Sequence, residues 1–178
     1  MKTGLVLLMT ISAVLMLATA GSAQENTTDN AIAIMKDVNG STVGVATFTE
    51  DDYGLVRIQV LVCGQEPGLH GIHIHEKGDC TAPSFTSAGG HYNPLCKEHG
   101  FNNPNGPHAG DLPNLVVGLD GTGYMDVITD SVTLSPGPTT LFPENGTSLI
   151  IHSGPDDQIT DPAGNSGDRI VCGVIEEK

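Results

Sequence analysis

The stretch Gly68-Leu-His-Gly-Ile-His-Ile-His75 decides how the whole chain is interpreted. Histidines alternate with aliphatic residues in it, and a β-strand points residues i and i+2 to the same face. His73 and His75 would therefore converge from one strand on one point in space, as ligands of a transition metal do. His70 has the opposite parity and should face away. We therefore expect a β-protein with a metal site on this strand.

The rest of the chain also has the pattern of a β-protein. Short runs rich in Val, Ile and Thr recur, and no long helical periodicity follows residue 23. Asn39-Gly40 and Asp120-Gly121 are dipeptides that tight hairpin turns favour. Strands are predicted at Ala31–Lys36, Thr42–Thr49, Leu55–Val62, Leu115–Leu119, Gly123–Ile128, Ser148–His152 and Arg169–Ile175. With the histidine strand, this predicts an all-β fold, an eight-stranded antiparallel Greek-key barrel or sandwich.

Two long irregular segments, 76–113 and 153–168, separate the later strands. A compact domain seldom contains so long a connection unless it is functional or is held by a metal or a disulfide. The first segment contains four potential metal ligands and two cysteines, so we interpret it as a functional loop. The second contains four aspartates and no lysine.

The first 23 residues have the pattern of a secretory signal peptide. Lys2 precedes an apolar run, and small residues surround two cleavage points before the sequence becomes polar. We expect cleavage after Ala23 and a single domain over residues 24–178. The alternative is a membrane anchor, because the run approaches the roughly 18 apolar residues that a spanning helix needs. Cleavage would give a periplasmic or extracellular protein without a membrane segment.

The charge and the cysteines limit the partners and the compartment. A net charge of −14 argues against binding to nucleic acid and to anionic membrane surfaces. Four cysteines in an exported chain favour disulfides, although the sequence permits three full pairings and selects none of them. Three glycosylation sequons begin at Asn26, Asn39 and Asn145.

Six histidines and one aspartate form two potential ligand sets. The first set comes from one loop: His91, His99, His108 and Asp111. Three imidazoles and one carboxylate suit a tetrahedral structural zinc site. The second set comes from strands: His73, His75 and His152. With a fourth imidazole from His91, this set would be an all-nitrogen site that suits copper. A single buried histidine is usually only hydrogen-bonded, and the spacing alone does not show that His91 is shared.

Five motifs resemble the copper/zinc superoxide dismutase family, in the order that this family has them. The motifs are Gly68–Glu76, Thr86–Pro94, His108–Leu112, Leu149–His152 and Gly164–Ile175. The resemblance extends from about residue 31 to residue 175. It implies an enzyme that converts two superoxide radicals and two protons to dioxygen and hydrogen peroxide, with copper cycling between Cu(II) and Cu(I), in antioxidant defence outside the cytoplasm.

The resemblance also implies a role for individual residues. One copper per subunit would be bound by His73, His75, His91 and His152. One zinc per subunit would be bound by His91, His99, His108 and Asp111. His91 would bridge the two metals as an imidazolate and carry a proton when its bond to copper opens. Asp156 is similar in position to a carboxylate that hydrogen-bonds the free nitrogens of His73 and His99.

Arg169 resembles the family's arginine above copper, where a permanent cation can orient an anionic substrate. The alternative is a surface ion pair with Asp168. Because the neighbouring loop is acidic, we expect electrostatic steering of superoxide that is weaker than usual or differently placed.

The resemblance further implies a disulfide between Cys80 and Cys172. Cys63 and Cys96 could pair with each other, remain buried thiols or form an intermolecular bridge. His70 is expected to make a structural hydrogen bond.

Two other classes of function fit the sequence less well. An exported copper-binding or copper-delivery protein would need neither Arg169 nor a bridged site, and a structural extracellular β-domain would leave seven metal-competent side chains unexplained. The expected partner is superoxide, a small-molecule substrate. A homodimer and a copper-delivery partner are compatible with the resemblance, but the sequence locates no interface.

Overall fold

The computed structural model describes residues 30–178. The predicted signal peptide, its cleavage after Ala23 and the sequon at Asn26 lie outside the described residues. Within residues 30–178 the elements are β1 (Asn30–Asp37), β2 (Thr42–Glu50), β3 (Val56–Val62), β4 (Gly68–His70), β5 (Ile72–His75), the short 3-10 helix η1 (Thr86–Ala88), β6 (Leu115–Val117), β7 (Gly123–Thr129), β8 (Ser148–His152) and β9 (Arg169–Glu177). No helix in this part of the chain has the length and hydropathy needed to cross a membrane.

The alternation of apolar residues builds the core, as the period of two predicts. In β3, for example, Val56, Ile58 and Val60 are fully buried, and the residues between them point outward. Both predicted hairpin turns are present. Gly40 and Gly121 have φ values of +81° and +76°, which glycine adopts without steric cost.

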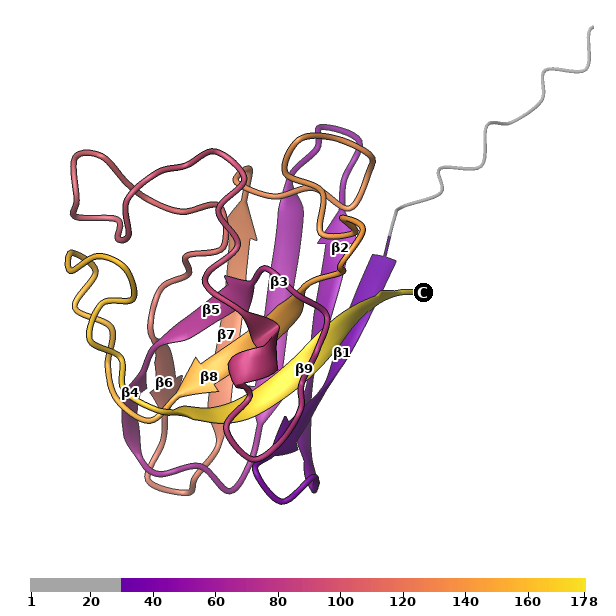
Figure 1. The fold of residues 1–178 in the computed structure, drawn as a ribbon. Helices are drawn as coiled ribbons and strands as arrows, with labels where there is room; N and C mark the ends of the chain where they lie inside the picture. Colours follow the sequence, from indigo (N-terminus) through magenta and orange to yellow (C-terminus); the bar gives the residue numbers. More distant parts are fainter. Residues whose placement is uncertain (1–29) are drawn as a thin grey trace, which may run out of the picture.

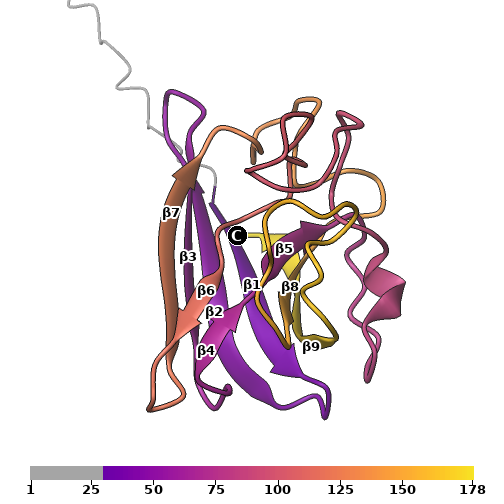
Figure 2. The same ribbon diagram turned by 90° about the vertical axis from the view of Figure 1, so that its left-hand side faces the viewer.

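The nine strands form one antiparallel sheet with the order β4-β6-β7-β3-β2-β1-β9-β8-β5. The strands β4 and β5 are consecutive in sequence and lie at the two opposite edges of this sheet, so the sheet curls into a nearly closed barrel (Figures 1 and 2). β3 pairs with β7 instead of the next strand in sequence, which gives the barrel a long crossover connection. The predicted all-β antiparallel barrel is confirmed.

The count of nine strands instead of eight has a local cause at Gly71. We expected one strand through residues 68–75, but it is divided into β4, which pairs with β6, and β5, which pairs with β8. Between them, the Gly71 N–H donates to the Gly154 carbonyl, and the Gly71 carbonyl accepts the His152 N–H, both at 2.8 Å. The chain therefore passes from one sheet edge to the other at this residue.

The remaining strand boundaries agree with the predictions within two residues. The strand predicted at Leu115–Leu119 ends at Val117, because Gly118 already belongs to the turn and donates its N–H to the Thr122 carbonyl at 2.9 Å.

The two long loops lie side by side beyond β5 and β8 (Figure 1). They are joined by hydrogen bonds from the Asn102 N–H to the Gln158 carbonyl at 2.9 Å and from the His99 N–H to Asp161 Oδ1 at 2.8 Å. The two long irregular segments predicted from the sequence are loops in the structure, and together they cover one side of the barrel.

A disulfide joins Cys80 in the first loop to Cys172 in β9, as the resemblance implied. Next to it, Phe85 and Ala88 pack against Ile150 in a small hydrophobic cluster of their own. Cys63 and Cys96 are both free and exposed, so the interpretations of a mutual pair and of buried thiols are wrong for this structure.

We predict that the double substitution Cys80→Ser/Cys172→Ser lowers the free energy of unfolding by about 2–5 kcal/mol, because the disulfide closes a loop between residues 92 positions apart. Urea unfolding of the two proteins measures this difference. The matched control is Cys63→Ser/Cys96→Ser, which removes two exposed free thiols. Equal losses in both double variants would contradict the structural role of the disulfide.

Candidate metal centre

In β5, alternation places isoleucines on the face toward the core and histidines on the opposite face. Ile72 and Ile74 belong to the main hydrophobic core. His73 and His75 point to the other face, yet they are only 0% and 1% exposed because the long loops cover them. The predicted convergence of these two imidazoles is therefore present in the folded chain.

Two groups of side chains have donor atoms that all lie within 4.8 Å of one another. The first group, called here the all-histidine group, consists of His73, His75, His91 and His152. The second, called here the aspartate-containing group, consists of His91, His99, His108 and Asp111. Every member of both groups is buried. The structure thus brings together all seven of the ligand residues named from the sequence, and it places His91 in both groups.

In the all-histidine group, each ring has one nitrogen bonded to protein and one without a partner. The bonded nitrogens are His73 Nε2 with Asp156, His75 Nδ1 with the Gly89 carbonyl, His91 Nδ1 with Asp111 and His152 Nδ1 with the Gly167 carbonyl. The unpartnered nitrogens are His73 Nδ1, His75 Nε2, His91 Nε2 and His152 Nε2. An unsatisfied buried polar atom costs about 1–3 kcal/mol, so four of them in one place fit a bound metal ion. A set of four imidazoles suits copper.

In the aspartate-containing group, the donor atoms surround one common point. Asp111 Oδ1 lies 2.9 Å from His91 Nδ1, 3.0 Å from His99 Nδ1 and 3.3 Å from His108 Nδ1. The Nδ1 atoms of His91 and His108 are 3.4 Å apart. A tetrahedral zinc ion with bonds of about 2.0–2.1 Å has ligand atoms about 3.3 Å from one another. These residues therefore fit zinc in donor type, number and spacing.

The turn at His108-Ala-Gly-Asp111 forms as the sequence indicated. The Asp111 N–H donates to the His108 carbonyl at 3.3 Å, and the His108 N–H donates back to Asp111 Oδ2 at 2.9 Å. A third bond, from the Gly100 N–H to the same Oδ2, also measures 2.9 Å. These backbone bonds orient the carboxylate so that its other oxygen faces the three imidazoles.

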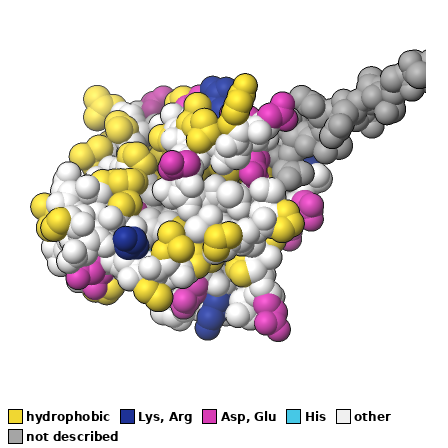
Figure 3. Space-filling view, turned by 90° about the horizontal axis from the view of Figure 1, so that it is seen from above, with side chains coloured by type: hydrophobic (Ala, Val, Ile, Leu, Met, Phe, Trp, Pro, Cys, Tyr) yellow, Lys and Arg dark blue, Asp and Glu magenta, His cyan; other side chains and the backbone are white. Residues whose placement is uncertain are grey.

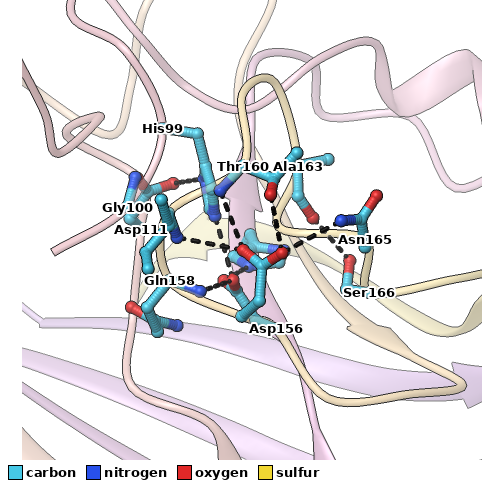
Figure 4. A network of polar contacts seen from close by, with 12 residues as sticks. His99, Gly100, Asp111, Asp156, Gln158, Thr160, Ala163, Asn165 and Ser166 are labelled. Atoms are coloured by element: carbon cyan, nitrogen blue, oxygen red, sulfur yellow. Dashed lines mark hydrogen bonds and ion pairs between the residues drawn. The ribbon is translucent and has the colours of Figure 1, made fainter. Parts of the chain in front are cut away.

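Asp156 connects the two groups, as the resemblance implied. Its Oδ2 lies 2.7 Å from His73 Nε2, and its Oδ1 lies 3.0 Å from His99 Nε2. Figure 4 shows the imidazole of His99 between the carboxylates of Asp156 and Asp111. Gly164 makes room for this arrangement, since it has a φ of +59° and an added Cβ would overlap the Asp156 carboxylate. A ligand of each group is therefore oriented by one buried carboxylate.

Asn114 holds Asp156 in place and was not among the residues predicted from the sequence. Its amide nitrogen donates to the Asp156 carbonyl, and its amide oxygen accepts the Asp156 N–H, both at 2.8 Å. In the sequence, Asn114 is marked only as a polar residue between Pro113 and the start of an apolar strand. That signal does not say which distant residue the amide will bind.

The protonation preferences of the two groups differ. Burial lowers the pKa of His91 to about 4 and that of His152 to about 3, and it holds the pKa of His75 well below its usual value. Burial also opposes protonation of His99, but the hydrogen bonds from Asp111 and Asp156 outweigh it and raise the pKa of His99 to about 9. At neutral pH the metal-free all-histidine group is mostly neutral, whereas the ring of His99 holds a proton.

Arg169 is fixed by backbone carbonyls. Its guanidinium donates to the Phe85 carbonyl at 2.7 Å and to the Gly89 carbonyl at 2.6 Å. The Gly89 carbonyl also contacts His75 Nδ1 at 3.1 Å, so one oxygen links the arginine to the all-histidine group. Among residues 30–178, no ion pair includes Arg169. The alternative of a surface ion pair with Asp168 is therefore wrong.

His70 lies outside both groups. Its ring nitrogens contact the His152 carbonyl at 2.7 Å and the Glu66 carbonyl at 2.8 Å. The predicted structural hydrogen bond is confirmed, and one of its partners is the backbone of a residue in the all-histidine group.

Comparison with known proteins agrees with this geometry. The family described as copper/zinc superoxide dismutase matches residues 42–175. The superoxide dismutase (Cu-Zn) 2 of Aquifex aeolicus is 47% identical over 141 residues, which are 78% of this chain and 82% of that protein. The superoxide dismutase-like protein YojM of Bacillus subtilis is 49% identical over 140 residues, or 76% of this chain and 70% of that protein.

The solved structures lead to the same family. A crystal structure of a SOD-like protein from Bacillus subtilis is 46% identical, covers 80% of this chain and 96% of its own, and superposes with a TM-score of 0.75. The family match over residues 42–175 includes both loops and the strands β5 and β8 that carry members of the all-histidine group. This chain belongs to the copper/zinc superoxide dismutase family, whose members are oxidoreductases that use copper and zinc.

Proposed function

We propose that this chain dismutates superoxide with copper held by the all-histidine group and zinc held by the aspartate-containing group. The observation that carries the proposal is the set of four unpartnered nitrogens that converge in the first group. One of them is Nε2 of His91, whose Nδ1 faces the second group. A site for copper alone would need only one of the two nitrogens of this ring.

Copper supplies one-electron chemistry through Cu(II) and Cu(I), and zinc supplies a fixed charge without redox chemistry. The protein supplies orientation and proton transfer. His91 can hold a proton at Nε2 while its Nδ1 remains directed at the aspartate-containing group. Asp156 fixes the rings of His73 and His99, and Arg169 presents a permanent cation to the superoxide anion. His91 and Arg169 are thus the residues proposed to act on the substrate.

A second candidate function is copper binding or delivery without turnover. A relative that is 49% identical carries the name superoxide dismutase-like protein. The arginine held by two carbonyls favours turnover, because copper storage does not require a cation for an anionic substrate.

We also propose that the chain acts outside the cytoplasm, in the periplasm or the extracellular space. The disulfide between Cys80 and Cys172 supports an oxidising compartment. We further propose that the chain receives copper from a delivery partner and assembles as a homodimer.

Metal analysis together with superoxide consumption tests this function. We expect one copper and one zinc per chain and fast consumption that cyanide inhibits, because cyanide binds copper. Removal of both metals with a chelator should abolish consumption, and adding both back should restore it. Two bound metals without turnover would instead favour copper binding. A protein that binds copper but not stoichiometric zinc would contradict the bridging role of His91.

We predict that Arg169→Ala lowers the rate of superoxide consumption roughly tenfold, because the substrate loses the cation that orients it. The metal content should be unchanged. The matched control is Arg57→Ala, which removes an exposed arginine paired with Asp126 and should keep the rate.

The acidic loop before Arg169, which contains Asp157, Asp161 and Asp168, also predicts a weak dependence of the rate on ionic strength. On the face seen in Figure 3, acidic side chains outnumber basic ones, and no histidine of the described residues is visible. A steep fall of the rate with added salt would contradict weak steering.

We predict that, in protein without copper, the apparent affinity for zinc rises with pH, by about tenfold per pH unit between about pH 6 and 9, and then levels off. Below its pKa of about 9, His99 holds a proton that zinc must displace. In protein without zinc, copper affinity should change little above about pH 5, because His91 and His152 have pKa values of about 4 and 3. Competition with a chelator of known affinity, corrected for its own protonation, measures both. Equal pH slopes for the two metals would contradict this prediction.

A further inference from the structure

One peptide unit lies between a carboxylate and two side chains of the candidate metal centre. The carbonyl oxygen of Gly89 accepts hydrogen bonds from Arg169 Nη2 at 2.6 Å and from His75 Nδ1 at 3.1 Å. The same peptide unit, called here the Gly89–Gly90 peptide, ends in the N–H of Gly90, which donates to Glu76 Oε1 at 3.1 Å. A continuous path of hydrogen bonds therefore connects the carboxylate of Glu76 to the arginine and to the imidazole.

The backbone holds Glu76 against this peptide. Glu76 directly follows β5, and its own N–H donates to the Gly90 carbonyl at 3.0 Å. The next N–H, that of Lys77, donates to the Ala88 carbonyl at 3.1 Å. Gly89 has a φ of +75°, and a Cβ at this position would overlap the carboxylate of Glu76. Glycine at position 89 is therefore needed both for the turn and for the close approach of Glu76.

The negative charge of Glu76 is not neutralised by a neighbouring cation. Among residues 30–178, no ion pair includes Glu76, and its Oε1 accepts the Gly90 N–H. A charged acceptor forms a stronger hydrogen bond than a neutral one. Hydrogen bonds in a chain polarise one another, and a peptide unit transmits this polarisation because its C–N bond has partial double-bond character. The carboxylate at the N–H end therefore makes the Gly89 carbonyl a stronger acceptor.

Arg169 and His75 both depend on that carbonyl. The Gly89 carbonyl fixes one arm of the guanidinium, and the Phe85 carbonyl fixes the other at 2.7 Å from Nη1. Because His75 donates its Nδ1 proton to the Gly89 carbonyl, its unpartnered Nε2 is free to bind a metal. The shared oxygen thus sets the position of the cation relative to the all-histidine group.

We propose that Glu76 is a positioning residue for anion binding at the candidate metal centre, acting on Arg169 and His75 through the Gly89–Gly90 peptide. This inference rests on the proposed function, because it assumes copper in the all-histidine group and an anion beside Arg169. Long-range electrostatics alone predicts the opposite effect of Glu76, since a negative charge near an anion site weakens anion binding. The sign of the effect therefore separates positioning from simple charge.

Azide binding to the Cu(II) protein tests this inference, because azide is a small anion whose complex with Cu(II) absorbs in the near ultraviolet. We expect Glu76→Ala to raise the azide dissociation constant about fivefold, the factor that the loss of one hydrogen bond gives. The rate of superoxide consumption should fall by a similar factor. Glu76→Gln keeps an oxygen that can accept the Gly90 N–H, so both quantities should stay within about twofold of the unsubstituted protein. Copper and zinc contents should be equal in all three proteins.

The matched control is Glu144→Ala, which removes the same charge from an exposed position. The loop of Glu144 lies next to the segment of Glu76, since the Gly78 N–H donates to the Asn145 carbonyl at 2.8 Å. This variant should bind azide at least as tightly as the unsubstituted protein. Azide binding in Glu76→Ala that is equal to or tighter than in the unsubstituted protein overturns the inference.

A second measurement separates this inference from the proposed function, because it needs neither turnover nor Cu(II). In protein kept reduced with ascorbate, nuclear magnetic resonance follows the exchange of the Arg169 guanidinium protons with water, and the signals are assigned by their absence in Arg169→Lys. We expect faster exchange in Glu76→Ala and unchanged exchange in Glu76→Gln. Faster exchange in Glu76→Ala of a protein that does not consume superoxide would support the positioning of Arg169 and contradict the proposed function. Unchanged exchange in Glu76→Ala overturns the positioning role of Glu76, whatever the activity.

Discussion

The imidazole of His91 must face two groups of ligands at once, and much of the surrounding structure serves to hold that ring in place. Its Nδ1 lies 2.9 Å from Asp111, and its Nε2 belongs to the four unpartnered nitrogens of the all-histidine group. The backbone beside it is bound to β5, because the Tyr92 N–H donates to the Ile74 carbonyl at 2.8 Å. The Tyr92 hydroxyl extends this attachment to the Thr140 carbonyl at 2.6 Å. These hydrogen bonds attach the loop around His91 to the β-sheet and fix the position of its ring.

The two long loops depend on each other for the same reason. Asp156 from the second loop orients His99 from the first, and it also orients His73 from β5. The disulfide to Cys172 and the burial of Phe85 hold the start of the first loop against the barrel. The same loop provides the carbonyls that bind Arg169. The candidate metal ligands, their orienting carboxylate and Arg169 therefore form one connected unit that is built from the two loops and from strands β5, β8 and β9.

The sequence predicted the strands and the candidate ligands of this unit, but not the contacts between residues distant in sequence. Alternation located the strands well, because the core requires a period of two, and the motif resemblance named all seven ligand residues. The sharing of His91 could not follow from spacing, since it depends on how the first loop folds back onto β5. The division of the histidine strand at Gly71 was missed because hydrogen bonds to Gly154 and His152, both distant in sequence, cause it. The contacts of Asn114 and of the Gly89 carbonyl were missed for a similar reason, because neither depends on a local pattern.

The most direct test of the bridging role of His91 is the electron paramagnetic resonance spectrum of the Cu(II) protein with Co(II) bound in place of zinc. Strong exchange coupling between two metal ions needs a short covalent path, and a shared imidazolate is one. The geometry predicts that cobalt in the aspartate-containing group strongly weakens the Cu(II) signal and that His91→Ala restores it. An undiminished Cu(II) signal with stoichiometric cobalt bound would mean that the two groups hold their metals without a shared ligand, and the account of His91 would be wrong.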